Sequence, residues 1–282
     1  MQCSILLFYI VYCILYIVGG AAGELLIRYS LQHALHRLGA STTVIRSDSE
    51  FNRLKSENYD YIIVDPWTWA GPGWIAKTVL RGQNSKIFVL DFFGYQHLRG
   101  KSLQLPDERY LTAFGGSIGN TFLGYYLPPL DLSIETNINP VKKQQGVIWG
   151  KDSKHFNGDI RRKMLIALAD RVPLIATTNK IFNHPNIQWL GHLTRDKWHK
   201  ILLESRFMIG LGDPLLGPSA IDAISSGCVY INPLYSTPIR EHFTSQHPYA
   251  KSEIGAPRVC SVNLNEIESV MSCVEGALNT DL

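Results

Sequence analysis

The sequence lacks the features that mark several common classes of protein. Its 282 residues carry a formal net charge of only +3 and the basic residues are scattered, so no nucleic-acid partner is expected. No internal repeat or low-complexity segment is present. No Asp-x-Asp pair offers two carboxylates to a divalent metal ion, and the five cysteines match no zinc-binding spacing. We therefore predict a protein without a metal site.

The cysteines are few and unevenly placed. Cys3 and Cys13 lie in an apolar run at the start, and Cys228, Cys260 and Cys273 lie in the last quarter of the chain. If the protein folds in an oxidising compartment, the last three cysteines allow one disulfide. The sequence does not choose the pair.

Positive charge is missing from the first part of the chain. Residues 3–18 are nearly all apolar, and an extension to Ala22 approaches the roughly 20 residues of a membrane-spanning helix. A single membrane signal-anchor and a signal peptide cleaved near the small residues 20–23 are both open, but the first basic residue is Arg28, so the expected positive flank is absent. A buried strand is the third alternative, which we favour for residues 13–18 while leaving the first half of the run open.

Hydrophobic residues make up 45% of the chain, enough for one large core or two modest ones. Short apolar strands alternate with helices in two series, which is typical of α/β proteins with parallel sheets. A polar stretch at 137–145 reads as a linker, so residues 19–136 and 146–282 are predicted as two domains. The expected strands are 43–45, 61–65, 86–91, 146–149, 174–177, 206–209 and 229–231, and the expected helices of the second series lie near 158–171, 194–204, 217–226 and 266–278.

The chain is organised around a glycine-rich stretch at 210–233. An apolar strand ends at Gly210, a loop follows with Gly212 and Gly217, and a short helix is expected from Pro218 to Gly227. A strand, a glycine loop and a helix N-terminus together expose backbone N–H groups that can bind a diphosphate. The alternative is a turn that tolerates glycine in any α/β domain.

Neighbouring motifs favour the first interpretation. With Ile148-Trp-Gly-Lys-Asp upstream and Ser245-Gln-His-Pro-Tyr-Ala followed by Ile254-Gly-Ala-Pro-Arg-Val downstream, the chain resembles the family 18 glycosyltransferases, the α-1,6-mannosylglycoprotein 6-β-N-acetylglucosaminyltransferases. The likeness runs from about Gly19 to Asn279. It implies the GT-B architecture, in which two Rossmann-like domains face one cleft and ligands bind at the carboxyl ends of the strands.

The resemblance also implies an activity. It predicts inverting transfer of N-acetylglucosamine from UDP-N-acetylglucosamine (UDP-GlcNAc) to the 6-hydroxyl of an α-1,6-linked mannose on the N-glycans of glycoprotein acceptors. No cofactor or metal ion is expected. The implied location is the Golgi membrane with a lumenal catalytic domain. Known members are much longer, so the chain is expected to be a shortened form.

Glu24 is the predicted catalytic residue. It stands in Gly23-Glu24-Leu25, where the family has its catalytic base, and would take the proton from the mannose 6-hydroxyl as that oxygen attacks the anomeric carbon. The alternative is an acidic residue that only favours a helix N-terminus.

The donor is expected at the glycine-rich stretch. The backbone amides of the segment from Gly217 to Ala220, in which Pro218 itself has no N–H, are candidates for the diphosphate, with Ser219 at the helix start and Lys151 as a mobile cation. Asp222, where the family has Glu, is expected to hold the ribose hydroxyls. Ser245, Gln246 and His247 belong to the family signature and are predicted to touch the donor, although for His247 a structural hydrogen bond is the main alternative.

Two departures from the family pattern affect this prediction. The family reads Glu-Gly-Pro where this chain has Leu216-Gly-Pro, so a polar group beside the donor is lost. A Lys-rich segment of the family is reduced to residues 234–240, which end in Arg240. These changes leave open a related transferase with an altered donor, or an inactive homologue that binds a nucleotide or glycan.

Aromatic residues cluster after the strand ends of the first series. Sugar rings stack on such faces, so Trp67, Trp69 and Phe92 are predicted to contact the acceptor glycan. Packing in the core is the alternative for them.

Overall fold

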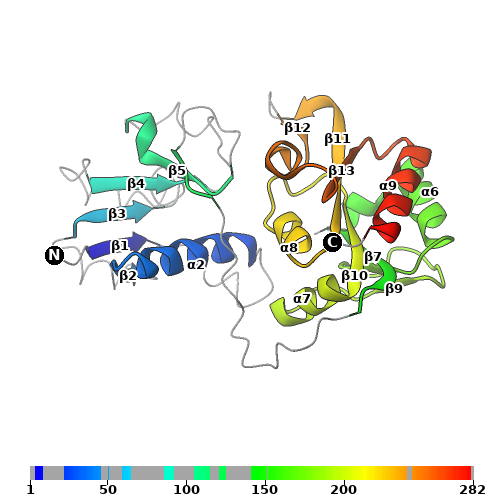
Figure 1. Ribbon diagram of the computed structural model, residues 1–282, viewed down its shortest axis with the longest axis horizontal. Helices are drawn as coiled ribbons and strands as arrows, with labels where there is room; N and C mark the ends of the chain where they lie inside the picture. Colours follow the sequence, from blue (N-terminus) through cyan, green and yellow to red (C-terminus); the bar gives the residue numbers. More distant parts are fainter. Residues whose placement is uncertain are drawn as a thin grey trace. The chain divides into compact units, whose positions relative to one another are not determined.

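A computed structural model of the chain describes residues 4–8, 22–45, 50, 59–64, 86–91, 105–114, 121–124, 141–150, 152–239 and 243–280. The chain divides into two compact units, Met1–Leu130 and Asp131–Leu282. Each unit contains its own β-sheet, and most strand pairs are parallel (Figure 1).

The described part of the N-terminal unit forms a sheet of six parallel strands in the order β2-β1-β3-β4-β5-β6. Helix α2 (Ala22–Arg37) follows β1 and is tied to β2 by a hydrogen bond from Gln32 Nε2 to Thr42 Oγ1 at 3.2 Å. The strands are β1 (Ser4–Phe8), β2 (Ser41–Ile45), β3 (Tyr61–Val64), β4 (Ile87–Leu90), β5 (Tyr110–Thr112) and β6 (Thr121–Phe122).

The predicted strands of this unit are confirmed at 43–45, 61–65 and 86–91, with ends shifted by one or two residues. The first strand is different. It is β1 at Ser4–Phe8, and it lies between β2 and β3 in the sheet. The favoured strand at 13–18 lies outside the described residues. The first half of the apolar run therefore supplies a strand of this sheet.

The C-terminal unit is a parallel sheet in the order β11-β10-β7-β8-β9, extended on the β11 side by parallel β13 and antiparallel β12. The four strands predicted for this unit are all present. Each was predicted from a continuous apolar run, the pattern of a strand that is buried on both faces of a sheet. The strands are β7 (Lys143–Trp149), β8 (Leu174–Ala176), β9 (Ile187–Trp189), β10 (Ser205–Gly210), β11 (Val229–Ile239), β12 (Phe243–Ser245) and β13 (Val259–Val262).

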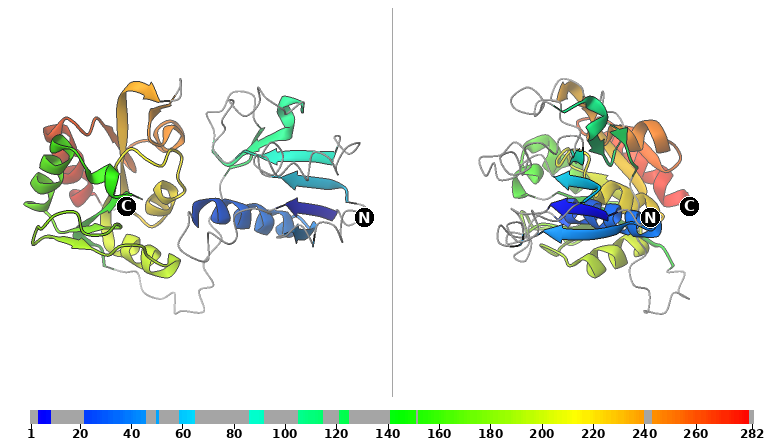
Figure 2. Two further views of the ribbon diagram at one scale, coloured as in Figure 1. Left: turned by 180° about the vertical axis from the view of Figure 1, so that it is seen from behind. Right: turned by 90° about the vertical axis from the view of Figure 1, so that its left-hand side faces the viewer.

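Helices cover both faces of this sheet (Figure 2). Alternate residues of β7 point to opposite sides: Ile148 packs in the cluster with α6 (Asp159–Ala169) and α9 (Ile267–Asn279), whereas Val147 and Trp149 pack with α7 (Arg195–Glu204) and α8 (Ser219–Ser225). The predicted positions of all four helices are confirmed.

The predicted linker at 137–145 is too long. Residues 143–145 already belong to β7, so the strand begins inside the polar segment.

Lys142, directly before β7, has a structural role. Its Nζ donates to the carbonyls of Leu202, Ser205 and Ser226 at 3.0, 2.8 and 2.6 Å, which joins the ends of α7 and α8 to the start of β7.

The structure also chooses the disulfide pair. Cys260 on β13 is bonded to Cys273 on α9. Cys228 is buried, and burial raises the pKa of its thiol to about 11, so it stays protonated and unreactive near neutral pH.

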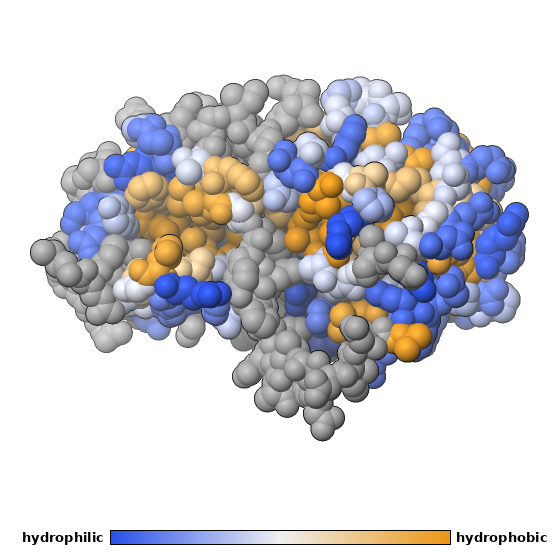
Figure 3. All heavy atoms as spheres, viewed as in Figure 1, coloured by the Kyte–Doolittle hydropathy of each residue, from blue (hydrophilic) through white to orange (hydrophobic). Residues whose placement is uncertain are grey.

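Hydrophilic residues cover much of the visible face of the C-terminal unit, with apolar atoms between them (Figure 3). The large apolar side chains exposed on that unit are scattered along the chain, namely Val141, Ile160, Leu190 and Ile239. Among the described residues, no helix is both long and apolar enough to cross a membrane.

Candidate functional site

The loop after β10 connects that strand to α8 and lies at the carboxyl end of the parallel strands, where ligands of such sheets bind. Gln246 holds this loop by three hydrogen bonds. Its Oε1 accepts from Gly212 N at 2.9 Å, its Nε2 donates to Pro214 O at 3.1 Å, and its backbone carbonyl accepts from Leu216 N at 3.0 Å. The loop therefore has a fixed backbone.

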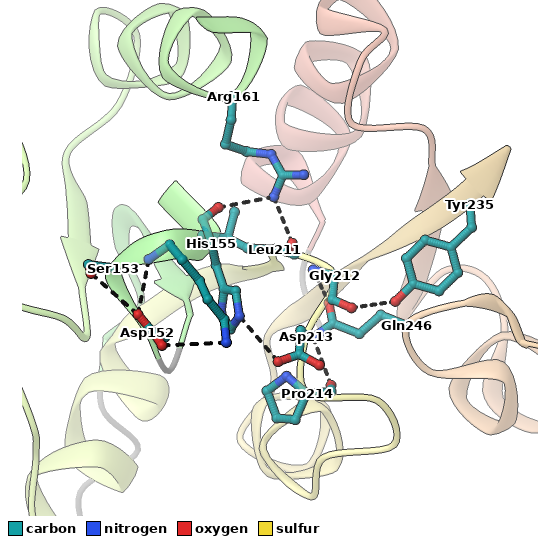
Figure 4. Close-up of polar contacts among 11 residues, drawn as sticks. Asp152, Ser153, His155, Arg161, Leu211, Gly212, Asp213, Pro214, Tyr235 and Gln246 are labelled. Carbon is teal, nitrogen blue, oxygen red and sulfur yellow. Dashed lines mark hydrogen bonds and ion pairs between the residues drawn. The ribbon is translucent and has the colours of Figure 1, made fainter. Parts of the chain in front are cut away.

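Two more side chains hold the beginning of the same loop (Figure 4). Arg161 of α6 donates through Nη1 to Leu211 O at 2.7 Å. The hydroxyl of Tyr235 on β11 donates to Gly212 O. Side chains from three separate parts of the chain, with the backbone of Gln246, thus hold Leu211, Gly212, Pro214 and Leu216.

The loop enters α8 through a close contact that requires glycine. A Cβ at Gly217 would lie 2.6 Å from Cη2 of Trp149, which leaves no room for a side chain. Pro218 has φ −60°, and its carbonyl accepts from Asp222 N at 2.9 Å, so proline sits in the first turn as predicted. Gly227, with φ +75°, ends the helix as predicted.

The N-terminus of α8 offers fewer free amides than predicted. The amide of Ala220 is not available to a ligand, because it donates to Gly217 O at 3.2 Å. In the described part of the chain, only the amides of Gly217 and Ser219 in this segment lack a hydrogen-bond acceptor in the protein. The predicted anion site is thereby reduced to two amides.

A histidine–aspartate pair joins this loop to the segment after β7. His155 lies on a short 3-10 helix, Ser153–Phe156, which the carboxylate of Asp152 caps by accepting from Lys154 N at 3.1 Å. Its Nε2 is 3.2 Å from Oδ2 of Asp213, with side-chain exposures of 9% for His155 and 58% for Asp213. Burial lowers the pKa of His155 below its ordinary value, although the carboxylate of Asp213 opposes this shift.

Asp222 contacts helix α7 through its carboxylate. Its side chain is 3% exposed, and both carboxylate oxygens accept from the guanidinium of Arg195 on α7. Trp198 Nε1 adds a hydrogen bond at 3.3 Å. A ribose would have to share this carboxylate with Arg195, and the role of Asp222 in holding the ribose stays a prediction. The side chain fixes α7 against α8.

The three signature residues after β11 are also internal. Ser245, Gln246 and His247 are each 0% exposed. That they touch the donor stays a prediction. Gln246 acts on the loop from behind. For His247 the structural alternative holds, since its Nδ1 accepts from Ala250 N at 3.1 Å. Burial lowers its pKa to about 3, which keeps the ring neutral.

Other predicted site residues cannot be placed. Glu24 lies in the first turn of α2, but its side chain is outside the described atoms. The remaining predicted site residues fall outside the described residues altogether: Lys151, Trp67, Trp69 and Phe92. Within the ranges that are described, no three His, Cys, Asp or Glu side chains group as ligands for a metal ion.

Leu216, the departure from the family pattern, is turned inward. It is 1% exposed, with φ +50°, a left-handed conformation that residues other than glycine rarely adopt. Asp213 is therefore the one charged residue between Gly210 and Pro218.

Sequence reasoning missed His155, Asp213 and Arg161. Only Asp213 could have been found from the sequence. It is an acidic residue that precedes a proline, in a glycine-containing loop that follows a predicted strand. His155 and Arg161 reach the loop from 50 or more positions away in the chain, and their spacing matches no motif.

Comparison with known proteins places the site in a family context. The family model described as glycosyltransferase family 18 matches residues 88–282, which include the whole loop. The human alpha-1,6-mannosylglycoprotein 6-beta-N-acetylglucosaminyltransferase A is 28% identical over an alignment that covers 74% of this chain and 31% of that protein. Enzyme B of Mus musculus is 25% identical, with 70% and 29% covered. The chain thus spans about a third of the length of these relatives.

Solved structures support the fold. The glycotransferase of kitacinnamycin superposes with a TM-score of 0.57 at 8% identity, covering 99% of this chain and 91% of that one. MurG of Acinetobacter baumannii gives a TM-score of 0.51 at 13% identity, covering 99% and 94%. The predicted architecture of two Rossmann-like α/β units, GT-B, is confirmed.

Proposed function

Because the chain belongs to glycosyltransferase family 18, we propose that it transfers N-acetylglucosamine from UDP-GlcNAc to N-glycans. The acceptor atom in this proposal is the 6-hydroxyl of an α-1,6-linked mannose, and the reaction inverts the anomeric centre. The observation that carries the proposal is the family match over residues 88–282, which includes the fixed loop at the carboxyl end of β10.

The C-terminal unit is assigned the donor. Its loop backbone is held by Gln246, Arg161 and Tyr235 before any ligand arrives, so binding would cost little ordering of the chain. The amides of Gly217 and Ser219 are the candidates for the diphosphate. We propose that hydrogen bonds and protein cations, and no metal ion, stabilise the departing charge.

The N-terminal unit is assigned the acceptor. In this unit Glu24 lies in the first turn of α2, the helix that follows the first strand. Its proposed role is to accept the proton from the attacking mannose hydroxyl, which is the one proton transfer that a single inverting displacement needs. The glycan would rest on Trp67, Trp69 and Phe92.

The proposed location is the Golgi lumen. The disulfide between Cys260 and Cys273 supports an oxidising compartment, since such bonds are rare in the cytosol. Protein isolated from its native cells under alkylating conditions should migrate differently on gels with and without reductant. Identical migration, with both thiols alkylated, would contradict this location.

The function is tested by incubating purified protein with UDP-GlcNAc and a biantennary N-glycan and mapping the linkage of any product. We expect a β-1,6 linkage on the α-1,6-linked mannose. Glu24→Gln is the matched variant, because glutamine keeps the size of the side chain but cannot take the proton. Turnover should fall by about 10²–10⁴-fold while affinity for UDP-GlcNAc stays nearly unchanged.

A second candidate function is favoured by Leu216, since the loop has no polar side chain at that position. A transferase with a different donor would give no product with UDP-GlcNAc and would transfer another sugar when the assay is repeated with other nucleotide sugars. An inactive homologue would bind UDP and transfer nothing, in wild type and in Glu24→Gln alike.

A further inference from the structure

Asp213 is the one charged residue of the fixed loop between Gly210 and Pro218. Its side chain is 58% exposed at the carboxyl end of β10. The residues beside it are immobilised: Gly212 by Gln246 and Tyr235, and Pro214 by Gln246 (Figure 4). An exposed carboxylate on so restrained a backbone points in a defined direction, which is the condition for specific recognition.

His155 lies behind this carboxylate. Its ring is 9% exposed, and Nε2 is at ion-pair distance, 3.2 Å, from Oδ2. Among the described residues neither ring nitrogen makes a hydrogen bond of good geometry. The other charged groups that face the ring are Lys154, Asp152 and Arg161. A buried polar ring without an aligned partner is unusual in a purely structural setting.

The charge of Asp213 limits what it can bind. A carboxylate repels phosphate groups and accepts hydrogen bonds from hydroxyls. On a loop that receives a nucleotide sugar, the hydroxyl groups of the transferred sugar are therefore its best partners. We propose that Asp213 recognises hydroxyls of the donor's sugar and that His155 is the residue that positions its carboxylate. This proposal rests on the proposed function. It assigns sugar recognition to Asp213, because Leu216 of the same loop is buried and has no polar side chain.

The same unit contains a matched control. His184 Nε2 is 3.2 Å from Asp170 Oδ1, with side-chain exposures of 11% and 65%, almost the values of the first pair. This pair lies at the opposite end of the strands, since Asp170 precedes β8 and His184 precedes β9. Its histidine is fully used, because Nδ1 accepts from Asn186 N at 3.3 Å. We assign it no ligand.

The experiment measures the affinities of UDP and UDP-GlcNAc by calorimetry for wild type, Asp213→Ala and Asp170→Ala. Loss of hydrogen bonds to a charged group should weaken UDP-GlcNAc binding by roughly 10- to 100-fold in Asp213→Ala. UDP affinity should stay within about twofold in that variant, since UDP lacks the sugar. Asp170→Ala should bind both ligands as wild type does.

His155 is tested as a positioning residue by rescue. His155→Ala should weaken UDP-GlcNAc binding and leave UDP binding unchanged, whereas His155→Gln, which keeps an N–H group, should restore most of the affinity for the sugar nucleotide. Equal loss in both variants would remove His155 from the proposal.

Three results would overturn the assignment of Asp213. Equal weakening of UDP and UDP-GlcNAc would mean that the carboxylate contacts the ribose or only supports the loop. Unchanged affinity for both would mean that it contacts neither. Equal weakening by Asp170→Ala would mean a general effect of charge.

If wild type binds neither nucleotide, the proposed function fails first and this proposal fails with it. That outcome is distinct from the other three.

Discussion

The C-terminal sheet has two ends, and each carries a histidine–aspartate pair of nearly the same distance and exposure. At the amino end, His184 and Asp170 complete a turn, and both ring nitrogens are used. At the carboxyl end, His155 and Asp213 face a loop whose backbone is held from three elements. The pairs differ in what surrounds them, not in residue type.

This difference shows how strand direction separates structural groups from candidate functional ones. At the amino end the polar groups bind one another: Lys142 joins the carbonyls at the ends of α7 and α8. At the carboxyl end an exposed carboxylate and two amides remain for a ligand. Mutations at the amino end should therefore change stability, and mutations at the carboxyl end should change binding.

The largest expected effect is at Lys142. Lys142→Met removes an ammonium group and leaves three carbonyls without their donor, so the free energy of unfolding should fall by about 3–5 kcal/mol. Urea denaturation measures this. Lys143→Met is the neighbouring control: Lys143 is 60% exposed and pairs with Glu204, and its loss should cost about 1 kcal/mol or less. Equal costs for the two lysines would contradict the account of the amino end.

An intermediate effect is expected from pH. Burial lowers the pKa of His247 to about 3, whereas an unfolded histidine titrates near pH 6.5. As the pH falls below about 6.5 the unfolded state binds this proton first, so the free energy of unfolding should fall by up to about 1.4 kcal/mol per unit, until pH approaches 3. His247→Asn should make the free energy of unfolding less dependent on pH between 6.5 and 5, by the equivalent of one bound proton. Denaturation at several pH values measures this. An unchanged slope would show that His247 is protonated in the folded state.

The smallest effect is expected at Asp170. Because this carboxylate is exposed, Asp170→Lys should lower the free energy of unfolding by at most about 1 kcal/mol and leave UDP affinity unchanged. A thermal melt and a UDP titration check both parts. A clear loss of UDP affinity would erase the distinction between the two ends of the sheet.

Local rules sufficed for much of the fold. Gly227 was predicted to end a helix, and it does, with φ +75° and Cys228 N donating back to Ala223 O at 2.9 Å. Pro218 was predicted in the first turn of that helix and is found there. Such features depend on a few neighbouring residues, and so they can be inferred from a single sequence.

Long-range pairs could not be predicted. Asp222 is joined to Arg195, 27 positions earlier, a contact that no local rule indicates. Gln246 reaches back 34 positions to Gly212. The family likeness indicated that these residues matter, and the structure adds the contacts that they make within the protein, from Asp222 to α7 and from Gln246 to the loop.

The central claim is that the carboxyl end of the C-terminal sheet holds the donor nucleotide without a metal ion. Hydrogen–deuterium exchange of wild type with and without UDP, in EDTA, tests it most directly. We expect UDP to protect peptides that cover residues 210–220 and 152–156 and to leave those around Asp170 and His184 unchanged. Protection confined to the amino end, or seen only after Mn²⁺ or Mg²⁺ is added, would contradict the claim.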